Sequence, residues 1–192
     1  MSPLQEMFNV VTMVVPSLVS CIVWLLPPGT DFRNLHTGTI LLAMGMHLPF
    51  SFIYHVLLAM RALRDAVDNL PRKLDQTIIH VVCILAAFAL TNTIWYGVLC
   101  WATNSFFIFR LFRKDEARNA TGRMLNVGCG VGLYCLTMFI RGDFINAICG
   151  WVYFCAGGSL FYLKLGGWGY SLSHVCFAGL AWHVMYSAGA LG

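Results

Sequence analysis

A stripe of polar side chains lies inside an apolar stretch of the sequence. His47, Ser51 and His55 recur at every fourth residue between Thr37 and Met60, where almost all other side chains are hydrocarbon. In a helix, this spacing places the three side chains on one face. Imidazole and hydroxyl groups are costly at membrane depth, so polar residues in such a segment indicate a functional site.

Asp75 and His174 carry groups that complement this stripe. Histidine and aspartate bind catalytic zinc and activate its water, and a serine hydroxyl can orient that water or a substrate carbonyl. Each residue also has a simpler interpretation. A lone membrane histidine is often a hydrogen-bonded packing residue. Asp75 can be a helix N-cap, and Ser51 can bond back to its own helix.

The elements that must position these residues are membrane-spanning helices. Of the 192 residues, 59% are hydrophobic and 10% are charged, whereas a water-soluble domain carries about 25% charged residues. Backbone polar groups in lipid must be satisfied within their own segment, which favours helices. Seven apolar stretches are typical of spans: residues 7–26, 37–60, 75–90, 94–109, 124–140, 144–163 and 170–188. We therefore predict an all-α, multi-pass integral membrane protein with a single domain over residues 1–192.

The basic residues are distributed unequally between the two sides of the membrane that these spans define. One side holds ten of them: Arg61, Arg64, Arg72, Lys73, Arg110, Arg113, Lys114, Arg118, Arg123 and Lys164. The other side holds only Arg33 and Arg141. Because cytoplasmic loops collect lysine and arginine, this split predicts that the N-terminus is inside and the C-terminus outside.

Two classes of function are disfavoured by the same residues. The net charge is +4, but the positive residues form no continuous basic stripe, so we expect no nucleic-acid partner. The eight cysteines show no CxxC spacing, which disfavours a zinc ribbon or a disulfide scaffold.

With this orientation, the position of a residue along a helix gives its depth in the membrane. His55 lies near the end of the second stretch, Asp75 opens the third, and His174 follows the start of the seventh. At 1.5 Å per residue, all three lie within roughly 10 Å of the inner face. His47 is about 12 Å from His55 along the helix axis. We therefore expect His47 to lie outside this group, with His183 as an alternative partner at similar depth.

Three short motifs resemble those of a known membrane superfamily. Ser51-Phe52-Ile53-Tyr54-His55, Leu74-Asp75 and Ser173-His174 look like the motifs of the CREST superfamily of seven-helix proteins. That group includes alkaline ceramidases, progestin and adipoQ receptors, and haemolysin III-like proteins. The resemblance implies zinc dependence, and several members hydrolyse the amide bond of ceramide-like lipids. It implies zinc ligands at His55 and His174, and catalytic roles for Ser51 and Asp75.

The seventh stretch departs from the pattern of this superfamily. Its members carry His-x-x-x-His there, but Ala178 follows His174 at the position of the second histidine. An alignment on His183 instead places Gly179 at the first position. Either alignment lacks one ligand, and two protein ligands hold catalytic zinc poorly.

The motifs, together with the missing histidine in the seventh stretch, lead to two possible functions. The first is a degenerate zinc-hydrolase site in a non-catalytic structural or accessory subunit, with membrane lipids and other subunits of a larger membrane complex as partners. The second is a zinc-dependent lipid amide hydrolase, similar to ceramidases, with its site near the inner membrane face. A receptor or small transporter is disfavoured, because the inner loops are short and no pair of broken helices is evident.

Overall fold

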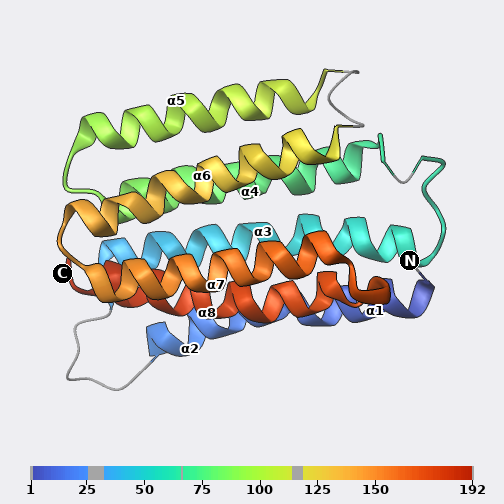
Figure 1. Cartoon of the computed structure of the whole chain (residues 1–192), viewed down its shortest axis with the longest axis horizontal. Coiled ribbons are helices and arrows are strands. Elements are labelled where there is room, and N and C mark those ends of the chain that lie inside the picture. The colour runs from blue at the N-terminus through green and yellow to red at the C-terminus, as the bar shows by residue number, and fades with distance from the viewer. Residues whose placement is uncertain (1, 26–32, 66, 114–118, 192) are drawn as a thin grey trace.

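Helices make up all the regular secondary structure in the described part of this computed structural model, which covers residues 2–25, 33–65, 67–113 and 119–191. They are α1 (Pro3–Thr12), α2 (Val14–Leu25), α3 (Leu35–Ala59), α4 (Leu70–Leu90), α5 (Ile94–Leu111), α6 (Ala120–Ile140), α7 (Phe144–Leu163) and α8 (Gly169–Gly189). A short 3₁₀ turn, η1 (Leu165–Gly167), precedes α8. The helices lie side by side along the long axis of the molecule (Figure 1). The all-α prediction is confirmed.

The third predicted stretch is longer than the sequence indicated. Its helix, α4, begins at Leu70 because the Asn69 side chain caps the first turn and Pro71 suits a position there. Asp75 therefore lies inside the helix rather than at its start. The interpretation of Asp75 as a helix N-cap is wrong.

The first predicted stretch is divided into two helices. α1 ends at Thr12 and α2 begins at Val14, while the predicted end at residue 26 lies outside the described residues. Pro16 has no N–H to donate to the carbonyl of Thr12, and its ring crowds that carbonyl. The interruption is short, because Met13 between the two helices keeps helical backbone angles and Pro3–Leu25 still forms one membrane-length stretch.

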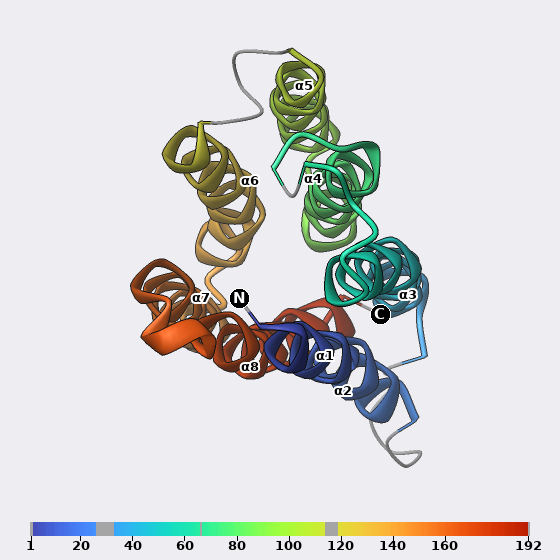
Figure 2. The same cartoon turned by 90° about the vertical axis from the view of Figure 1, so that its right-hand side faces the viewer.

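The helices form a layered bundle in which α8 has the most varied neighbours (Figure 2). α8 packs between α7 and α2 and also touches α1, α3 and α4. α4 packs against α3, α5 and α6, which leaves α5 at the periphery. Segments from both ends of the chain therefore meet along α8.

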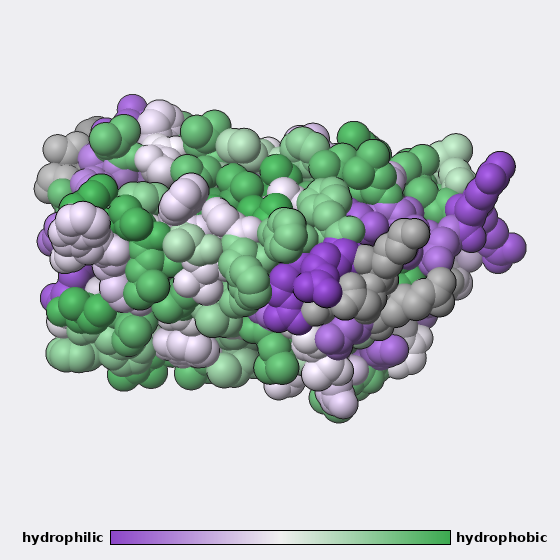
Figure 3. All heavy atoms as spheres, turned by 90° about the horizontal axis from the view of Figure 1, so that it is seen from above, coloured by the Kyte–Doolittle hydropathy of each residue, from purple (hydrophilic) through white to green (hydrophobic). Residues whose placement is uncertain are grey.

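The surface of the bundle is apolar along its length. Five helical stretches in the described residues are long and apolar enough to cross a membrane: Pro3–Leu25, Leu35–Ala59, Leu70–Leu90, Ala120–Ile140 and Phe144–Leu163. Leu35, Trp95 and Ile145 are 83%, 77% and 76% exposed. In Figure 3, apolar residues are spread along the face, and strongly hydrophilic residues lie at its right-hand end and in one patch just right of the centre. These features are those of an integral membrane protein.

The two ends of the bundle differ in charge. Eight of the ten basic residues assigned to one side lie at or beyond the helix ends that surround the N-terminus. Lys114 and Arg118, the other two, lie outside the described residues. Arg33 and Arg141 lie at the opposite end. The antiparallel arrangement thus separates the basic residues as the sequence predicted.

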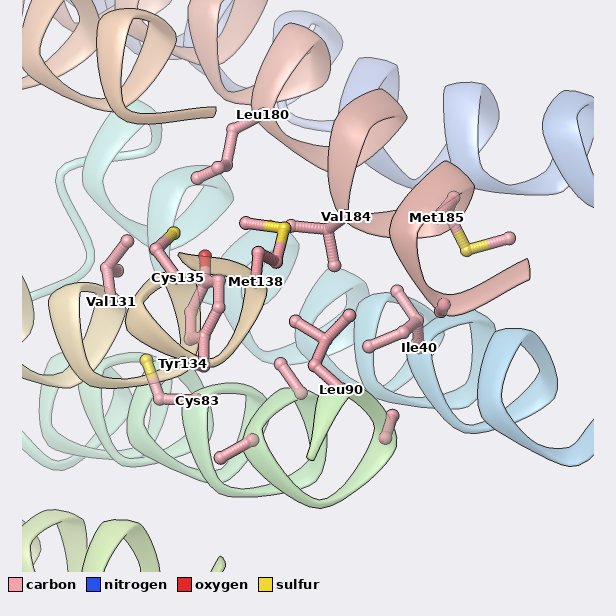
Figure 4. Close-up of a cluster of buried hydrophobic side chains, with 14 of the residues drawn as sticks. Ile40, Cys83, Leu90, Val131, Tyr134, Cys135, Met138, Leu180, Val184 and Met185 are labelled. Carbon is pink, nitrogen blue, oxygen red and sulfur yellow. The ribbon is translucent and has the colours of Figure 1, made fainter. Parts of the chain in front are cut away.

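The apolar core lies where α4, α6 and α8 face one another (Figure 4). Leu90, Met138 and Met185 are fully buried there. Nearby, the His80 Nδ1 lies 2.9 Å from Oδ1 of Asn104, which joins α4 to α5. A Cβ on Gly130 would lie 2.5 Å from the same oxygen, so the glycine allows this close packing of α6.

Side chains from other helices bind the carbonyl groups at the C-terminal ends of α4 and α8. Arg141 donates from Nη1 to the carbonyl of Leu90 at 2.7 Å and from Nη2 to that of Ser187 at 2.8 Å. Asn34 donates to the carbonyl of Gly189 at 3.3 Å. The last carbonyls of a helix have no partner within it, and they attract positive charge. Arg141 therefore ties three helices together at this end.

We expect Arg141→Met to lower the free energy of unfolding by about 2 kcal/mol, because two helix-end carbonyls lose a charged donor. Unfolding in mixed detergent micelles measures this change. Arg33→Met is the matched control, since Arg33 is exposed and only lies over the Trp24 ring at 5.7 Å. An equal loss in both variants would contradict the role given to Arg141.

Candidate functional site

The structure brings the four predicted site residues into one buried region near the N-terminal end of the bundle. Ser51 and His55 come from α3, Asp75 from α4 and His174 from α8. Their exposed fractions are 2%, 2%, 3% and 9%. The region also contains residues that the sequence did not single out. We call the whole set the polar cluster: Glu6, Asn9, Thr12, His47, Ser51, His55, Asp75, Ser171 and His174.

The shortest acid–imidazole contact in the polar cluster joins α1 to α3. The Nδ1 of His55 lies 2.8 Å from Oε2 of Glu6, and both side chains are buried. Asn9 donates from Nδ2 to the same carboxylate oxygen at 3.1 Å. Placing a carboxylate in an apolar interior is costly unless it is paired and hydrogen-bonded. The cost of burying the Glu6 carboxylate is therefore offset by its contacts with one residue of α3 and one of its own helix.

A second acid–imidazole contact joins α3 to α4. The Nε2 of His47 lies 3.3 Å from Oδ1 of Asp75, without the alignment of a hydrogen bond. Ser51 is buried on the same face of α3, next to the same carboxylate group. The expectation that His47 lies outside the group is wrong, because Asp75 lies inside α4 and faces the stripe on α3. All three residues of the stripe thus belong to one cluster.

The remaining contacts of the polar cluster join α1 to α8. The Oγ1 of Thr12 lies 3.0 Å from Nδ1 of His174. Ser171 donates to Oδ1 of Asn9 at 2.6 Å. The ring of Tyr170 contacts His174 with ring centres 5.3 Å apart and also contacts His55 at 5.1 Å. The aromatic ring fills space beside both imidazoles.

Sequence reasoning missed the contribution of α1. Glu6, Asn9 and Thr12 are spaced three residues apart, which keeps them near one face of a helix. Each of them contacts another member of the polar cluster from that face. The predicted first stretch began at Met7 and so excluded the acid. The three-residue spacing of polar side chains in an apolar run was the signal available.

The described residues do not fit a three-ligand zinc site. Ala178 is buried at the position of the second histidine of the superfamily pattern. The Nδ1 atoms of His55 and His174 contact Glu6 and Thr12. In the described part of the chain, no group of three or more His, Cys, Asp or Glu side chains is placed to hold a metal ion. Catalytic zinc normally has three protein ligands, so we derive no zinc chemistry from this arrangement.

Some polar atoms of the cluster lack a partner within the described residues. The Nε2 of His55 is buried without a hydrogen bond, and Oδ1 of Asp75 is buried with only the unaligned contact to His47. Such atoms in a protein interior need an explanation, since an unmade hydrogen bond is costly. A small polar group bound beside these two atoms would supply the hydrogen bonds that they lack.

The alternative pairing of His47 with His183 is not present. His183 lies on the outer side of α8, with its Nδ1 2.9 Å from Oδ1 of Asn146 on α7. His47 lies at the middle of α3, against Asp75 of α4. The two histidines belong to separate polar groups.

Comparisons of the chain with protein-family models, with curated proteins and with solved structures find no significant match. The candidate site therefore depends on the contacts within this chain and on the resemblance of its motifs.

We expect Glu6→Leu to lower the free energy of unfolding by about 3 kcal/mol, because it leaves the buried His55 imidazole without its acid. His55→Leu should have a similar effect. The double variant should be more stable than the sum of the two losses predicts, since both partners are removed together. Unfolding of the four proteins in mixed micelles measures the coupling. Additive losses would show that the two side chains do not interact.

Proposed function

We propose that this chain is a CREST-like membrane protein whose hydrolase-type site is degenerate, and that it acts as a non-catalytic structural or accessory subunit of a larger membrane complex. One observation carries the proposal. Both histidines of the predicted zinc pair contact α1, His55 through Glu6 and His174 through Thr12. A helix of the chain itself therefore holds one ring nitrogen, Nδ1, of each histidine, which gives the two imidazoles a role in helix packing.

The missing ligand supports the same function. Ala178 cannot bind a metal, and its side chain is enclosed within the bundle. The contacts that remain connect α1 with α3, α1 with α8, and α3 with α4. A polar cluster arranged in this way stabilises helix packing, which is the role required of a structural subunit.

The proposal includes a topology in which all seven helical stretches cross the membrane, counting α1 and α2 as one. α5 and α8 have 18 and 21 residues, and they lie alongside the more apolar helices. The basic residues at the N-terminal end support an inside location for the N-terminus and an outside location for the C-terminus. With so little chain outside the helices, contacts with lipids and other subunits would be made mainly within the membrane.

A second candidate function is a zinc-dependent hydrolase of lipid amide bonds. It is favoured by the unpartnered Nε2 of His55 and Oδ1 of Asp75, which lie in the cluster that contains Ser51. A cofactor with an incomplete set of ligands would have to complete its coordination from outside the described residues. We place this function second because the described residues supply no third protein ligand.

Purification from native membranes in a mild detergent tests the first function against the second. We expect the chain to co-purify in fixed ratio with other membrane proteins, because an accessory subunit is retained by its complex. Elemental analysis of the same sample should give well under one zinc per chain. Native mass spectrometry and subunit quantification measure the ratio.

A different result of the same purification would favour the second function. A chain that purifies alone, holds about one zinc and releases fatty acid from a ceramide would establish the hydrolase instead. His55→Leu is the control for that activity, and Arg33→Met is a matched surface variant that should leave it unchanged.

A further inference from the structure

A cavity of about 770 Å³ lies at the end of the bundle that carries the C-terminus (Figure 1). Sites for small ligands typically have volumes of about 300–1,000 Å³. Three parts of the chain meet around this cavity: the turn between α4 and α5, the end of α6 with the turn that follows it, and the end of α8. We call it the turn cavity, and it is lined by residues 91–93, 96, 137, 140–143, 190 and 191.

The side chains that line the turn cavity carry one positive and one negative charge, on Arg141 and Asp143. Both side chains are half-buried. Among the ion pairs of the described residues, none joins Arg141 to Asp143. Asp143 is nevertheless close enough to act on the charge of the guanidinium. The cavity therefore presents a cation and an anion at separate places, and the two balance in charge.

Arg141 retains hydrogen-bond donors after it has bound the helix-end carbonyls. Its Nη1 donates to the carbonyl of Leu90, and its Nη2 donates to the carbonyl and the hydroxyl of Ser187. A guanidinium has five N–H groups in a planar fork that suits phosphate oxygens. Its Nε and one hydrogen of Nη1 have no acceptor within the described part of the chain. Arg141 can therefore hold a phosphate and still tie the helices together.

The start of α5 adds positive potential to the same cavity. Thr93, which lines the cavity, is the N-cap residue of α5, and its side chain makes no capping hydrogen bond. The first N–H groups of a helix have no partner within it, and they carry the positive end of the helix dipole. An anionic group in the turn cavity is therefore favoured by this helix end as well as by Arg141.

Asp143 retains capacity to accept hydrogen bonds. Its two carboxylate oxygens both accept from Nδ2 of Asn146, at 3.0 and 3.1 Å. It is the N-cap residue of α7, but its side chain makes no capping hydrogen bond. An ionised carboxylate has about four lone-pair sites, so one amide group does not saturate it. An ammonium group can form a charge-assisted hydrogen bond with the remaining sites.

Exposed apolar side chains lie beside the turn cavity. Ile140 lines it and is 66% exposed, and Ile94 and Trp95 in the first turn of α5 are 65% and 77% exposed. Tyr96 also lines the cavity and donates its O–H to the carbonyl of Leu133 at 2.7 Å. Tryptophan and tyrosine are enriched where membrane spans meet the headgroup layer. A charged cavity beside an apolar flank at this level suits a molecule with a polar head and hydrocarbon chains.

We propose that the turn cavity binds the headgroup of a phospholipid that carries both a phosphate and a primary ammonium, as phosphatidylethanolamine does. Arg141 holds the phosphate, Asp143 accepts from the ammonium, and the acyl chains lie along Ile94 and Ile140. A headgroup with one negative and one positive charge matches the two charged side chains of the cavity. The inference goes beyond the proposed function and does not depend on it, because it needs only the cavity and the surrounding membrane.

The same chemistry disfavours the other common headgroups. Phosphatidylglycerol has a phosphate but no cation, so its negative charge would lie near the unpaired carboxylate of Asp143. Phosphatidylcholine has a cation but no N–H, so it cannot donate a hydrogen bond to Asp143. The cavity should therefore prefer the ethanolamine headgroup to both.

Competition between lipids measured by native mass spectrometry tests this preference. The full-length protein, stripped of lipid in mixed micelles, receives equal amounts of phosphatidylethanolamine, phosphatidylcholine and phosphatidylglycerol with the same acyl chains. We expect the first bound lipid to be phosphatidylethanolamine, with an excess of about fivefold over phosphatidylglycerol and about threefold over phosphatidylcholine.

Asp143→Asn tests the role of the carboxylate. The variant removes the negative charge, keeps an oxygen that can accept from Asn146, and keeps a favourable N-cap residue. We expect the ratio of bound phosphatidylethanolamine to phosphatidylglycerol to fall about fivefold. Asp68→Asn is the matched control, because Asp68 pairs with Lys73 at the other end of the bundle. This control should leave the ratio unchanged.

Thermal unfolding of both variants separates lipid binding from a structural role. If Asp143→Asn lowers stability but leaves the ratio of bound lipids unchanged, the carboxylate acts only in packing and the proposal is wrong. Equal binding of all three lipids to the unmodified protein, or an equal change in the Asp68→Asn control, would also overturn it.

Soluble phosphoethanolamine distinguishes a lipid from a free compound with the same head. At a concentration equal to that of the lipid, it should leave most of the phosphatidylethanolamine bound, because it lacks the acyl chains that contact the apolar flank. Displacement of most of the lipid would show that the cavity selects a soluble ligand, and the phospholipid would be the wrong assignment.

Discussion

A carboxylate inside an apolar bundle must find a partner, and Glu6 finds His55 at 2.8 Å. This contact links the position of α1 to that of α3, and Asn9 and Thr12 extend the link from α1 to α8. The three polar side chains lie near one face of α1, because they are spaced three residues apart. Much of the N-terminal end of the bundle is organised by the need to satisfy these few buried groups.

The same need supports the proposed structural role despite the resemblance to hydrolase motifs. The structure brings Ser51, His55, Asp75 and His174 into one buried region. Ala178 stands where the superfamily pattern has its second histidine, and α1 contributes an acid and a hydroxyl to the same region. Buried polar residues are costly unless they pair with one another. In this chain they join four helices.

The sequence predicted the helices well, because long apolar runs and their breaks are local features. The gaps predicted between residues 90 and 94 and between residues 163 and 170 match the ends of the helices there to within one residue. The sequence also predicted that His55, Asp75 and His174 lie at a similar depth in the membrane. The sequence could not place His47 against Asp75, since that contact depends on α4 starting at Leu70 and on the rotation of α4 toward α3. Glu6 was missed for a related reason: an acid near the start of an apolar run has the pattern of a helix end, and only the tertiary arrangement turns it inward.

The central claim is that the acid and hydroxyl of α1, rather than a metal, hold the two histidines of the polar cluster. A high-resolution density map of the purified protein tests this claim most directly. The account predicts continuous contacts from Glu6 to His55 and from Thr12 to His174, with no metal density between the two imidazoles. Strong metal density bound by His55 and His174 would contradict it.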